Sequence, residues 1–203
     1  MCIRDRFIGT SAGGMNALLV AIEKMSAREL HEFWKRENIL SSMSTSWENK
    51  TSFLHTRPKY DGIGKTEILK KYLAEATIGD AKKPVITLSY DVENRKPRLL
   101  SSIHTPDIKA VSAAMATSAA PIYYPTAELE DGTWHIDGGI VSNNPSLIGY
   151  VEGIKYFNTN KVKVLSIGTG IDREKIDGSA SKKWGALGSV SYTHLRAHET
   201  THD

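Results

Sequence analysis

The sequence predicts an α/β fold in one domain. Segments with strand character are interleaved with segments of helical periodicity over most of the 203 residues, and such interleaving is typical of a largely parallel sheet covered by helices. The hydrophobic content of 40% is enough for a substantial core. No internal repeat divides the chain, so we expect one core rather than an array of small units.

Helices are expected to dominate the first third of the chain, after a strand end at Phe7-Ile8. Apolar residues recur there at the spacing of a buried helix face. The helices that this spacing predicts cover 15–24, the residues after Ser26, and 66–73. The second of them begins with a capping box, in which the Ser26 hydroxyl and the Glu29 carboxylate each bind a free backbone amide. Residues 39–60 are rich in polar residues and are expected to form a long irregular segment.

Strands and helices alternate in the rest of the chain. Alternating or apolar segments bounded by turn residues predict strands over 85–90, 98–103, 127–129, 134–136 and 161–167. A helix is predicted over 108–118, where Asp107 can cap the first turn and a run of alanines suggests close packing. A last helix is predicted from Asn144-Pro145, because asparagine is a good cap and proline suits the first helical position.

Composition excludes several classes of protein. The net charge is only +3, and the basic residues are scattered among acids without an aromatic-lined stripe, so nucleic-acid binding is not predicted. No run of residues reaches the roughly 18 consecutive apolar positions of a membrane span. Cys2 is the single cysteine, so no internal disulfide can form and none argues for secretion.

The two ends of the chain resemble translated sequencing-adapter tails. The resemblance covers residues 1–6 and about 190–203, and fold reasoning excludes such segments. We therefore expect the native domain to occupy residues 7–188. His194, His198 and His202 recur every fourth residue, as metal ligands on one helix face would, but in a translated tail this spacing carries no chemistry. Neither a metal site nor a cofactor is predicted.

The clearest chemical motif is Gly9-Thr10-Ser11-Ala12-Gly13-Gly14. It matches the nucleophile elbow, in which a strand turns sharply into a helix and holds a serine hydroxyl out of the sheet. Side chains at the flanking glycines would collide with the neighbouring strand and helix. The Ala12 amide, at the start of the helix, could donate to an oxyanion. A Gly-rich turn without chemistry fits the five-residue pattern equally well.

Two phosphate-binding motifs compete with this interpretation and fit less well. A Rossmann loop needs glycine at the position that Ser11 holds. Gly64-Lys65-Thr66 imitates the end of a Walker A loop, but the glycine required earlier in that motif falls at Lys59. We interpret Lys65-Thr66 as a helix start.

A second motif supplies a carboxylate. It is His135-Ile136-Asp137-Gly138-Gly139-Ile140, followed by Asn143-Asn144-Pro145. Together with the elbow, it resembles the patatin-like phospholipase family, in which a Ser–Asp dyad replaces the usual triad. Further stretches that resemble the family, in the family's order, are Lys59-Tyr60-Asp61-Gly62, the hairpin from Tyr90-Asp91 to Leu99, Ala116-Thr117-Ser118-Ala119-Ala120-Pro121, and Val164-Leu165-Ser166-Ile167-Gly168-Thr169-Gly170.

The resemblance implies a three-layer fold with a mainly parallel central sheet, and it implies roles for two residues. Ser11 would be the nucleophile and Asp137 the general base, while Gly138 and Gly139 would let backbone and substrate approach closely. The implied activity is hydrolysis of acyl esters in phospholipids or other acyl lipids, with peripheral contact at a membrane surface. Acyl transfer by the same serine and a catalytically dead lipid-binding fragment are the alternatives.

Two neighbouring side chains could be mistaken for catalytic groups. His135 could complete a Ser–His–Asp triad, but residues two apart on one strand rarely present the end-to-end geometry of a triad. Ser118 lacks the elbow glycines, so we expect it to have a packing role near the site. His31, His55 and His104 lack any motif context and are expected to be surface or structural residues.

The sequence departs from the family pattern at its start. The family builds part of its oxyanion hole from a Gly-rich loop upstream of the serine, and no such loop precedes Phe7. We therefore expect an incomplete domain that lacks the first strand and this loop. Such a chain would expose an apolar sheet edge and would be weakly active, inactive or prone to aggregate, because lost oxyanion donors slow acyl transfer.

Overall fold

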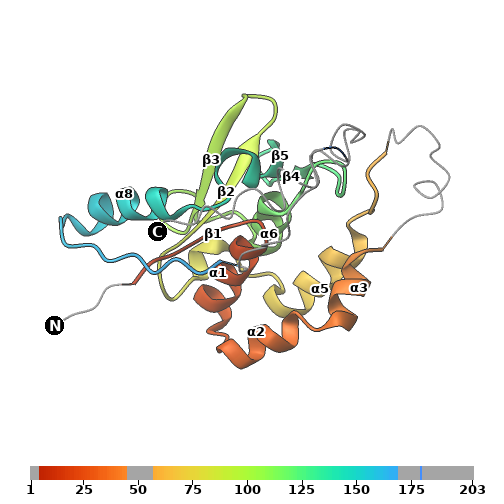
Figure 1. Ribbon diagram of the computed structural model, residues 1–203, viewed down its shortest axis with the longest axis horizontal. Helices are drawn as coiled ribbons and strands as arrows, with labels where there is room; N and C mark the ends of the chain where they lie inside the picture. Colours follow the sequence, from red (N-terminus) through yellow and green to blue (C-terminus); the bar gives the residue numbers. More distant parts are fainter. Residues whose placement is uncertain (1–4, 45–56, 169–178, 180–203) are drawn as a thin grey trace.

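The computed structural model describes residues 5–44, 57–168 and 179 and has a mixed α/β fold, which confirms the predicted fold class. The strands are β1 Phe7–Thr10, β2 Val85–Asp91, β3 Lys96–Ser101, β4 Ala127–Glu128 and β5 Trp134–Asp137. The helices are α1 Ala12–Glu23, α2 Ala27–Phe33, α3 Arg36–Ser42, α5 Ile63–Leu73, the 3-10 turn η1 Ile78–Asp80, α6 Ala110–Thr117, α7 Gly139–Ser142 and α8 Ser146–Phe157. Figure 1 shows the β2–β3 hairpin at one end of the molecule and α2, α3 and α5 at the other.

Strand β2 organises the sheet, because three other strands pair with it. β3 pairs with it antiparallel along one edge. On the other edge, β1 runs parallel to residues 85–88 and β5 runs antiparallel to residues 89–91. β1 and β5 therefore lie end to end, and both end at the middle of β2. This arrangement brings the ends of β1 and β5, which are far apart in the sequence, close together in space.

The expectation of a mainly parallel sheet is wrong for the described residues. The β1–β2 pair is parallel, whereas β2–β3, β2–β5 and β4–β5 are antiparallel. β2–β3 and β4–β5 are joined by short turns, and strands joined in this way pair antiparallel. Among the residues that the structure describes, β2 is the one strand that pairs with β1.

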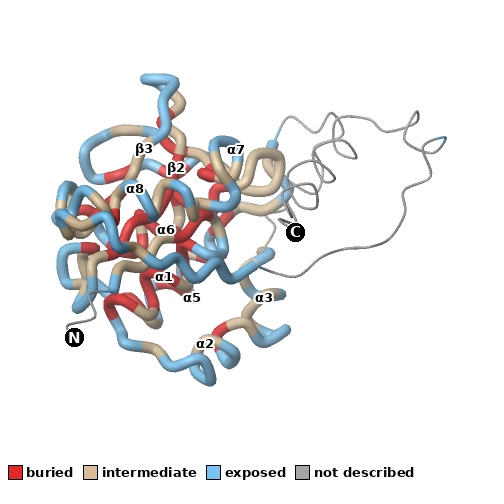
Figure 2. The backbone as a smooth tube through the Cα atoms, turned by 60° about the vertical axis from the view of Figure 1, so that its left-hand side comes forward, coloured by how far each residue is buried: buried red, intermediate tan, exposed pale blue. Residues whose placement is uncertain are grey.

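Helices cover both faces of the sheet, in agreement with the predicted three layers. α1 and α6 pack on the face that carries Phe7 and the main core. α7 and α8 contact β2 and β1 from the other face, where Ile8 lies close to Gly149 of α8. The buried residues in Figure 2 concentrate in α1, β2 and α6. Four fully buried alanines let α6 approach its neighbours closely, as the sequence predicted; they are Ala110, Ala113, Ala114 and Ala116.

Of three predicted helix caps, the structure contains one. The Ser26 capping box is present, with the Glu29 amide donating to Ser26 Oγ at 3.3 Å and the Ser26 amide donating to Glu29 Oε2 at 2.7 Å. The predicted start of α8 is wrong, because Pro145 holds the cap position and the helix begins at Ser146; Asn144 Oδ1 still accepts from the Ser146 amide at 3.1 Å. Asp107 does not cap α6, which begins at Ala110 without a side-chain cap.

Three predicted elements differ from the structure. α5 begins at Ile63, before the helix start expected at Lys65-Thr66. α3 occupies residues up to Ser42 that were expected to be irregular. The strand expected over 161–167 is not formed: residues 161–168 have no regular structure, and Leu165 and Ile167 are 84% and 85% exposed. Alternation of apolar side chains suits a strand, but a strand also needs a backbone partner, and none of the described strands pairs with this segment.

Candidate active site

The turn between β1 and α1 holds Ser11 in a strained backbone conformation. Its φ and ψ are 56° and −127°, a region that residues with a Cβ atom rarely adopt. The amides of Gly14 and Met15 donate to the Ser11 carbonyl at 2.9 and 3.1 Å, so the helix begins directly after the serine. Ala12 is the first helical residue, and amides in a first helical turn have no carbonyl partner within the helix.

The glycines around Ser11 are required at two positions and not at a third. A Cβ atom on Gly9 would lie 2.1 Å from the Gly13 carbonyl oxygen, and one on Gly14 would lie 2.7 Å from Thr117 Cγ2. A Cβ atom on Gly13 would meet nothing within 4 Å. The expected collision is therefore found at Gly9 and Gly14, whereas it is wrong for Gly13.

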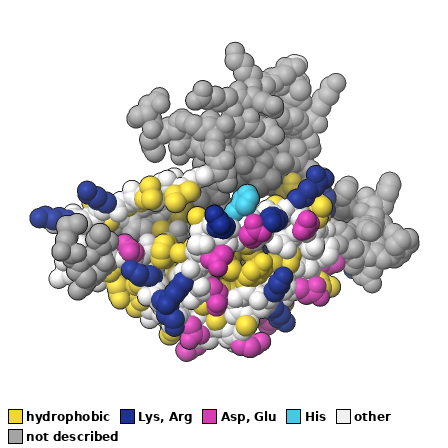
Figure 3. All heavy atoms as spheres, turned by 90° about the horizontal axis from the view of Figure 1, so that it is seen from below, with side chains coloured by type: hydrophobic (Ala, Val, Ile, Leu, Met, Phe, Trp, Pro, Cys, Tyr) yellow, Lys and Arg dark blue, Asp and Glu magenta, His cyan; other side chains and the backbone are white. Residues whose placement is uncertain are grey.

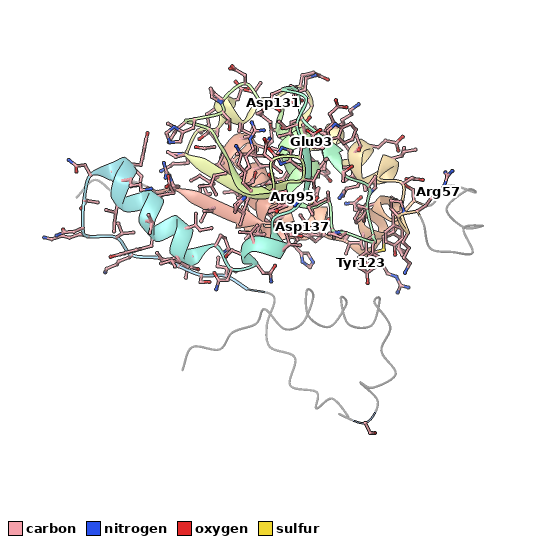
Figure 4. All side chains as sticks on the ribbon, turned by 90° about the horizontal axis from the view of Figure 1, so that it is seen from above. Arg57, Glu93, Arg95, Tyr123, Asp131 and Asp137 are labelled. Carbon is pink, nitrogen blue, oxygen red and sulfur yellow. The ribbon has the colours of Figure 1, made fainter. Side chains whose placement is uncertain are left out.

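Ser11 and Asp137 lie in direct contact although 126 positions separate them. Ser11 Oγ donates to Asp137 Oδ2 at 2.6 Å, and the Gly139 amide donates to Asp137 Oδ1 at 2.7 Å. The Asp137 side chain is buried, and Figure 4 shows it well apart from Asp131. The contact follows from the sheet, because β1 and β5 end at adjacent residues of β2, Leu88 and Ser89.

Close packing against β2 requires glycine at position 138. A Cβ atom on Gly138 would lie 2.2 Å from the Leu88 carbonyl oxygen. Glycine therefore lets the turn after Asp137 pass directly over β2. A Cβ atom on Gly139 would lie 3.0 Å from Asp137 Oδ1, so a side chain there would press on the carboxylate.

Residues 117–119, which we call the 117–119 segment, tie the serine and the aspartate to the sheet. Thr117 Oγ1 accepts from the Ser11 amide at 3.1 Å and donates to the Leu88 carbonyl at 2.6 Å. The Asp137 amide donates to the Ala119 carbonyl at 3.0 Å, and the Gly138 amide donates to the Thr117 carbonyl at 3.4 Å. The stretch resembles a block of the family in sequence, but nothing in the sequence singles out Thr117, because a threonine between small residues has no pattern of its own.

His135 does not contact Ser11; its ring nitrogens contact Ser89 of β2 and Thr133 instead. It is fully buried, with Nδ1 3.0 Å from Ser89 Oγ and Nε2 2.8 Å from Thr133 Oγ1. Burial and the nearby Arg98 guanidinium lower the pKa of His135, so the imidazole is neutral near pH 7. Ser118 is also buried, as expected for a packing role. His31 and His104 are exposed, whereas the remaining histidines, His55, His194, His198 and His202, lie outside the described residues.

Three further features concern metal binding, membrane spanning and surface charge. Within the part of the chain that the structure describes, no three His, Cys, Asp or Glu side chains gather as metal ligands do. Among the same residues, every helix is too short or too polar to span a bilayer. Basic and acidic side chains are interspersed on the face drawn in Figure 3.

The fold and the site define a mixed α/β protein in which a strained strand-to-helix turn presents a serine to a buried aspartate. A family model described as patatin-like phospholipase matches residues 2–148. The chain belongs to the patatin-like phospholipase family.

Relatives from bacteria and plants agree with this assignment. The chain is 33% identical to a cGAMP-activated phospholipase of Pseudomonas aeruginosa over 87% of its own length and 55% of the relative's. It is 31% identical to a cGAMP-activated phospholipase of Escherichia coli, over 94% of its own length and 56% of the relative's. It is 27% identical to patatin-like protein 4 of Arabidopsis thaliana, over 89% of its own length and 53% of the relative's. The chain thus spans about half the length of these curated relatives.

A solved structure, VipD from Legionella pneumophila, is also similar. The TM-score is 0.42 at 14% identity, over 68% of this chain and 40% of VipD. The family assignment rests on the sequence matches.

Proposed function

We propose that this chain is the catalytic core of a lipid acyl hydrolase of the phospholipase A type, with Ser11 as nucleophile and Asp137 as general base. The observation that carries the proposal is the 2.6 Å hydrogen bond from Ser11 Oγ to Asp137 Oδ2 at a strained turn. Membership of the patatin-like phospholipase family supports a lipid substrate. From the names of the bacterial relatives we carry over the phospholipase chemistry alone.

The proposed reaction proceeds through an acyl-enzyme. Asp137 takes the hydroxyl proton while Ser11 Oγ attacks the ester carbonyl carbon, and the carbonyl oxygen becomes an oxyanion. The Ala12 amide and the positive end of α1 favour that negative charge. The C–O bond to the lipid alcohol then breaks, and the alcohol leaves with the proton from Asp137. A water molecule next gives its proton to Asp137 and attacks the acyl group, which leaves as a fatty acid as Ser11 regains its proton.

Covalent capture of the serine tests the proposal, because it needs a single turnover. A fluorophosphonate probe is expected to label the 203-residue chain at Ser11, and Ser11→Ala is expected to abolish the label. Mass spectrometry of the labelled peptide identifies the residue. Ser112→Ala is the matched control, because Ser112 Oγ donates to Glu130 Oε1 at 2.6 Å rather than to Asp137. A folded chain that resists the probe, or a label on another residue, contradicts the proposal.

Product analysis separates hydrolysis from the two alternatives. With a phospholipid and an added alcohol, a hydrolase releases free fatty acid, whereas an acyltransferase forms the new ester. A lipid-binding fragment without chemistry releases neither product. The intact Ser11–Asp137 contact favours catalysis over lipid binding alone, because binding has no need of it.

We also propose that the face formed by α7 and the start of α8 meets the lipid surface. Five apolar side chains there are at least 36% exposed; they are Ile140, Val141, Leu147, Tyr150 and Val151. α7 begins two residues after Asp137, so a bilayer on this face would bring acyl esters close to the dyad. Exposed apolar side chains on helices bind at the headgroup boundary of a bilayer.

Leu147→Glu is expected to weaken binding to phosphatidylcholine vesicles by roughly tenfold or more, because an inserted leucine contributes about 1.5–3 kcal/mol. Leu147 is 73% exposed, so folding and fluorophosphonate labelling should be unchanged. Leu40→Glu is the matched control, since Leu40 is 58% exposed on α3 at the opposite end of the molecule. Vesicle co-sedimentation measures the binding, and an equal loss in both variants would argue against this face.

A further inference from the structure

Lys65 occupies a core position in α5. It lies one and two helical turns before Leu69 and Leu73, on the same face of the helix. Both leucines are fully buried, and Lys65 is 5% exposed. An apolar side chain would fill such a position at lower cost, because burying an ammonium group is expensive unless it is well paired. The presence of a lysine here therefore calls for a reason other than packing.

The ammonium group has three close partners. Lys65 Nζ donates to the Ser118 carbonyl at 2.8 Å and to Ser118 Oγ at 3.1 Å. It also lies 3.6 Å from the centre of the Tyr124 ring, a cation–π distance. These contacts hold the positive charge against the middle residue of the 117–119 segment.

The charges around this group single out Asp137. Burial lowers the pKa of Lys65 from 10.5 to about 7, and the Asp137 carboxylate opposes that shift. Tyr124 is the other titratable neighbour, and burial raises its pKa, so the phenol is neutral. At the preceding residue, Gly64, the neighbours are Ser41 of α3 and Ser44, and the Ser44 hydroxyl donates to the Asp61 carboxylate. Asp137 is the charged group that raises the pKa of Lys65 against the effect of burial.

We propose that Lys65 is a positioning residue for the Ser11–Asp137 pair, holding Asp137 in its carboxylate form and fixing the 117–119 segment that orients both residues. The inference rests on the proposed function of that pair. Two routes link Lys65 to the site. One is the charge interaction with Asp137, and the other runs through Ser118 to Thr117 and Ala119, which bind the Ser11 and Asp137 amides.

The test measures the rate of fluorophosphonate labelling of Ser11 against pH in the full chain. A general base must be ionised to act, so labelling falls at acid pH as Asp137 takes up a proton. Lys65→Met removes the charge that stabilises the carboxylate, and the acid midpoint is expected to rise by about 1 pH unit. Lys65→Gln keeps a donor for the Ser118 carbonyl but lacks the charge, so it should show the same rise and guards against misfolding of the first variant.

Two controls separate charge from packing. Lys70→Met removes an exposed lysine of the same helix and should leave the midpoint unchanged. Leu69→Ala opens a cavity beside Lys65 and should lower thermal stability without moving the midpoint.

The outcomes distinguish this inference from the proposed function. A wild-type chain that is labelled normally while Lys65→Gln keeps the wild-type midpoint overturns the role of Lys65 alone. An equal rise in Leu69→Ala also overturns it, because loosened packing would then explain the shift. Absence of labelling in the folded wild-type chain overturns both proposals.

Discussion

Asp137→Asn is expected to slow labelling of Ser11, and hydrolysis of a soluble short-chain ester, by roughly 100- to 10,000-fold. Asparagine has the size of aspartate, so its oxygen can still accept from the Gly139 amide, which now donates to Oδ1 at 2.7 Å. Its NH2 group then faces Ser11 Oγ, where the carboxylate now accepts at 2.6 Å. A donor in place of an acceptor cannot take the hydroxyl proton.

Asp131, in the turn between β4 and β5, provides the control. Asp131 binds the Arg98 guanidinium and Thr133 rather than Ser11, and the Arg98 hydrogen bond holds the pKa of its carboxyl far below the usual range. Asp131→Asn should therefore leave the rate of labelling unchanged and lower only the stability of the β4–β5 turn. If Asp137→Asn reacts like the wild type, Asp137 is not the base, whatever its distance from Ser11.

The motifs of the site could be found from sequence because each is local. Gly9 and Gly14 stand beside Ser11 because a strand turns into a helix there, and the steric reason acts between near neighbours. Such patterns can be recognised from the sequence, because the residues that form them are close neighbours along the chain. The same holds for the Ser26 capping box, whose two hydrogen bonds join residues three apart.

The assembly of the site could not be found in this way. Ser11 meets Asp137 because β1 pairs with one half of β2 and β5 with the other, and register is a property of the folded sheet. Thr117 matters because its hydroxyl bridges Ser11 and Leu88, which are distant in sequence. The strand expected over 161–167 was wrong for a related reason, since alternation of side chains does not supply a neighbouring backbone.

Lys65 is the clearest example of a residue hidden by its context. Its sequence neighbours Gly64 and Thr66 suggested only a helix start or a failed phosphate loop. Its role depends on three-dimensional surroundings, namely Ser118, the Tyr124 ring and the Asp137 carboxylate. A buried charge at an otherwise apolar helix face is costly to stability, and functional sites are where proteins retain such costs.

That cost gives a prediction for folding. The pKa of Lys65 is lowered from 10.5 to about 7 in the folded chain, with burial as the main cause. Below pH 7 the lysine is protonated in both the folded and the unfolded state, and the full penalty is present. Between pH 7 and 10.5 the unfolded chain binds more protons than the folded one, so the free energy of unfolding rises with pH. The rise from this group is about 2.5 kcal/mol between pH 7 and 9.

Lys65→Met is therefore expected to flatten this pH dependence and to raise the free energy of unfolding at pH 6 by roughly 2 kcal/mol. The gain is smaller than the full penalty, because the Ser118 carbonyl and hydroxyl lose a donor, which costs about 1–3 kcal/mol. Urea unfolding at pH 6 and pH 9, followed by tryptophan fluorescence, measures both effects. Lys70→Met, on the exposed side of α5, should keep the wild-type slope. Parallel curves for Lys65→Met and the wild type would mean that the ammonium is solvated, whereas a more stable variant with a displaced acid midpoint would mean that the chain gives up stability at this position to keep its aspartate charged.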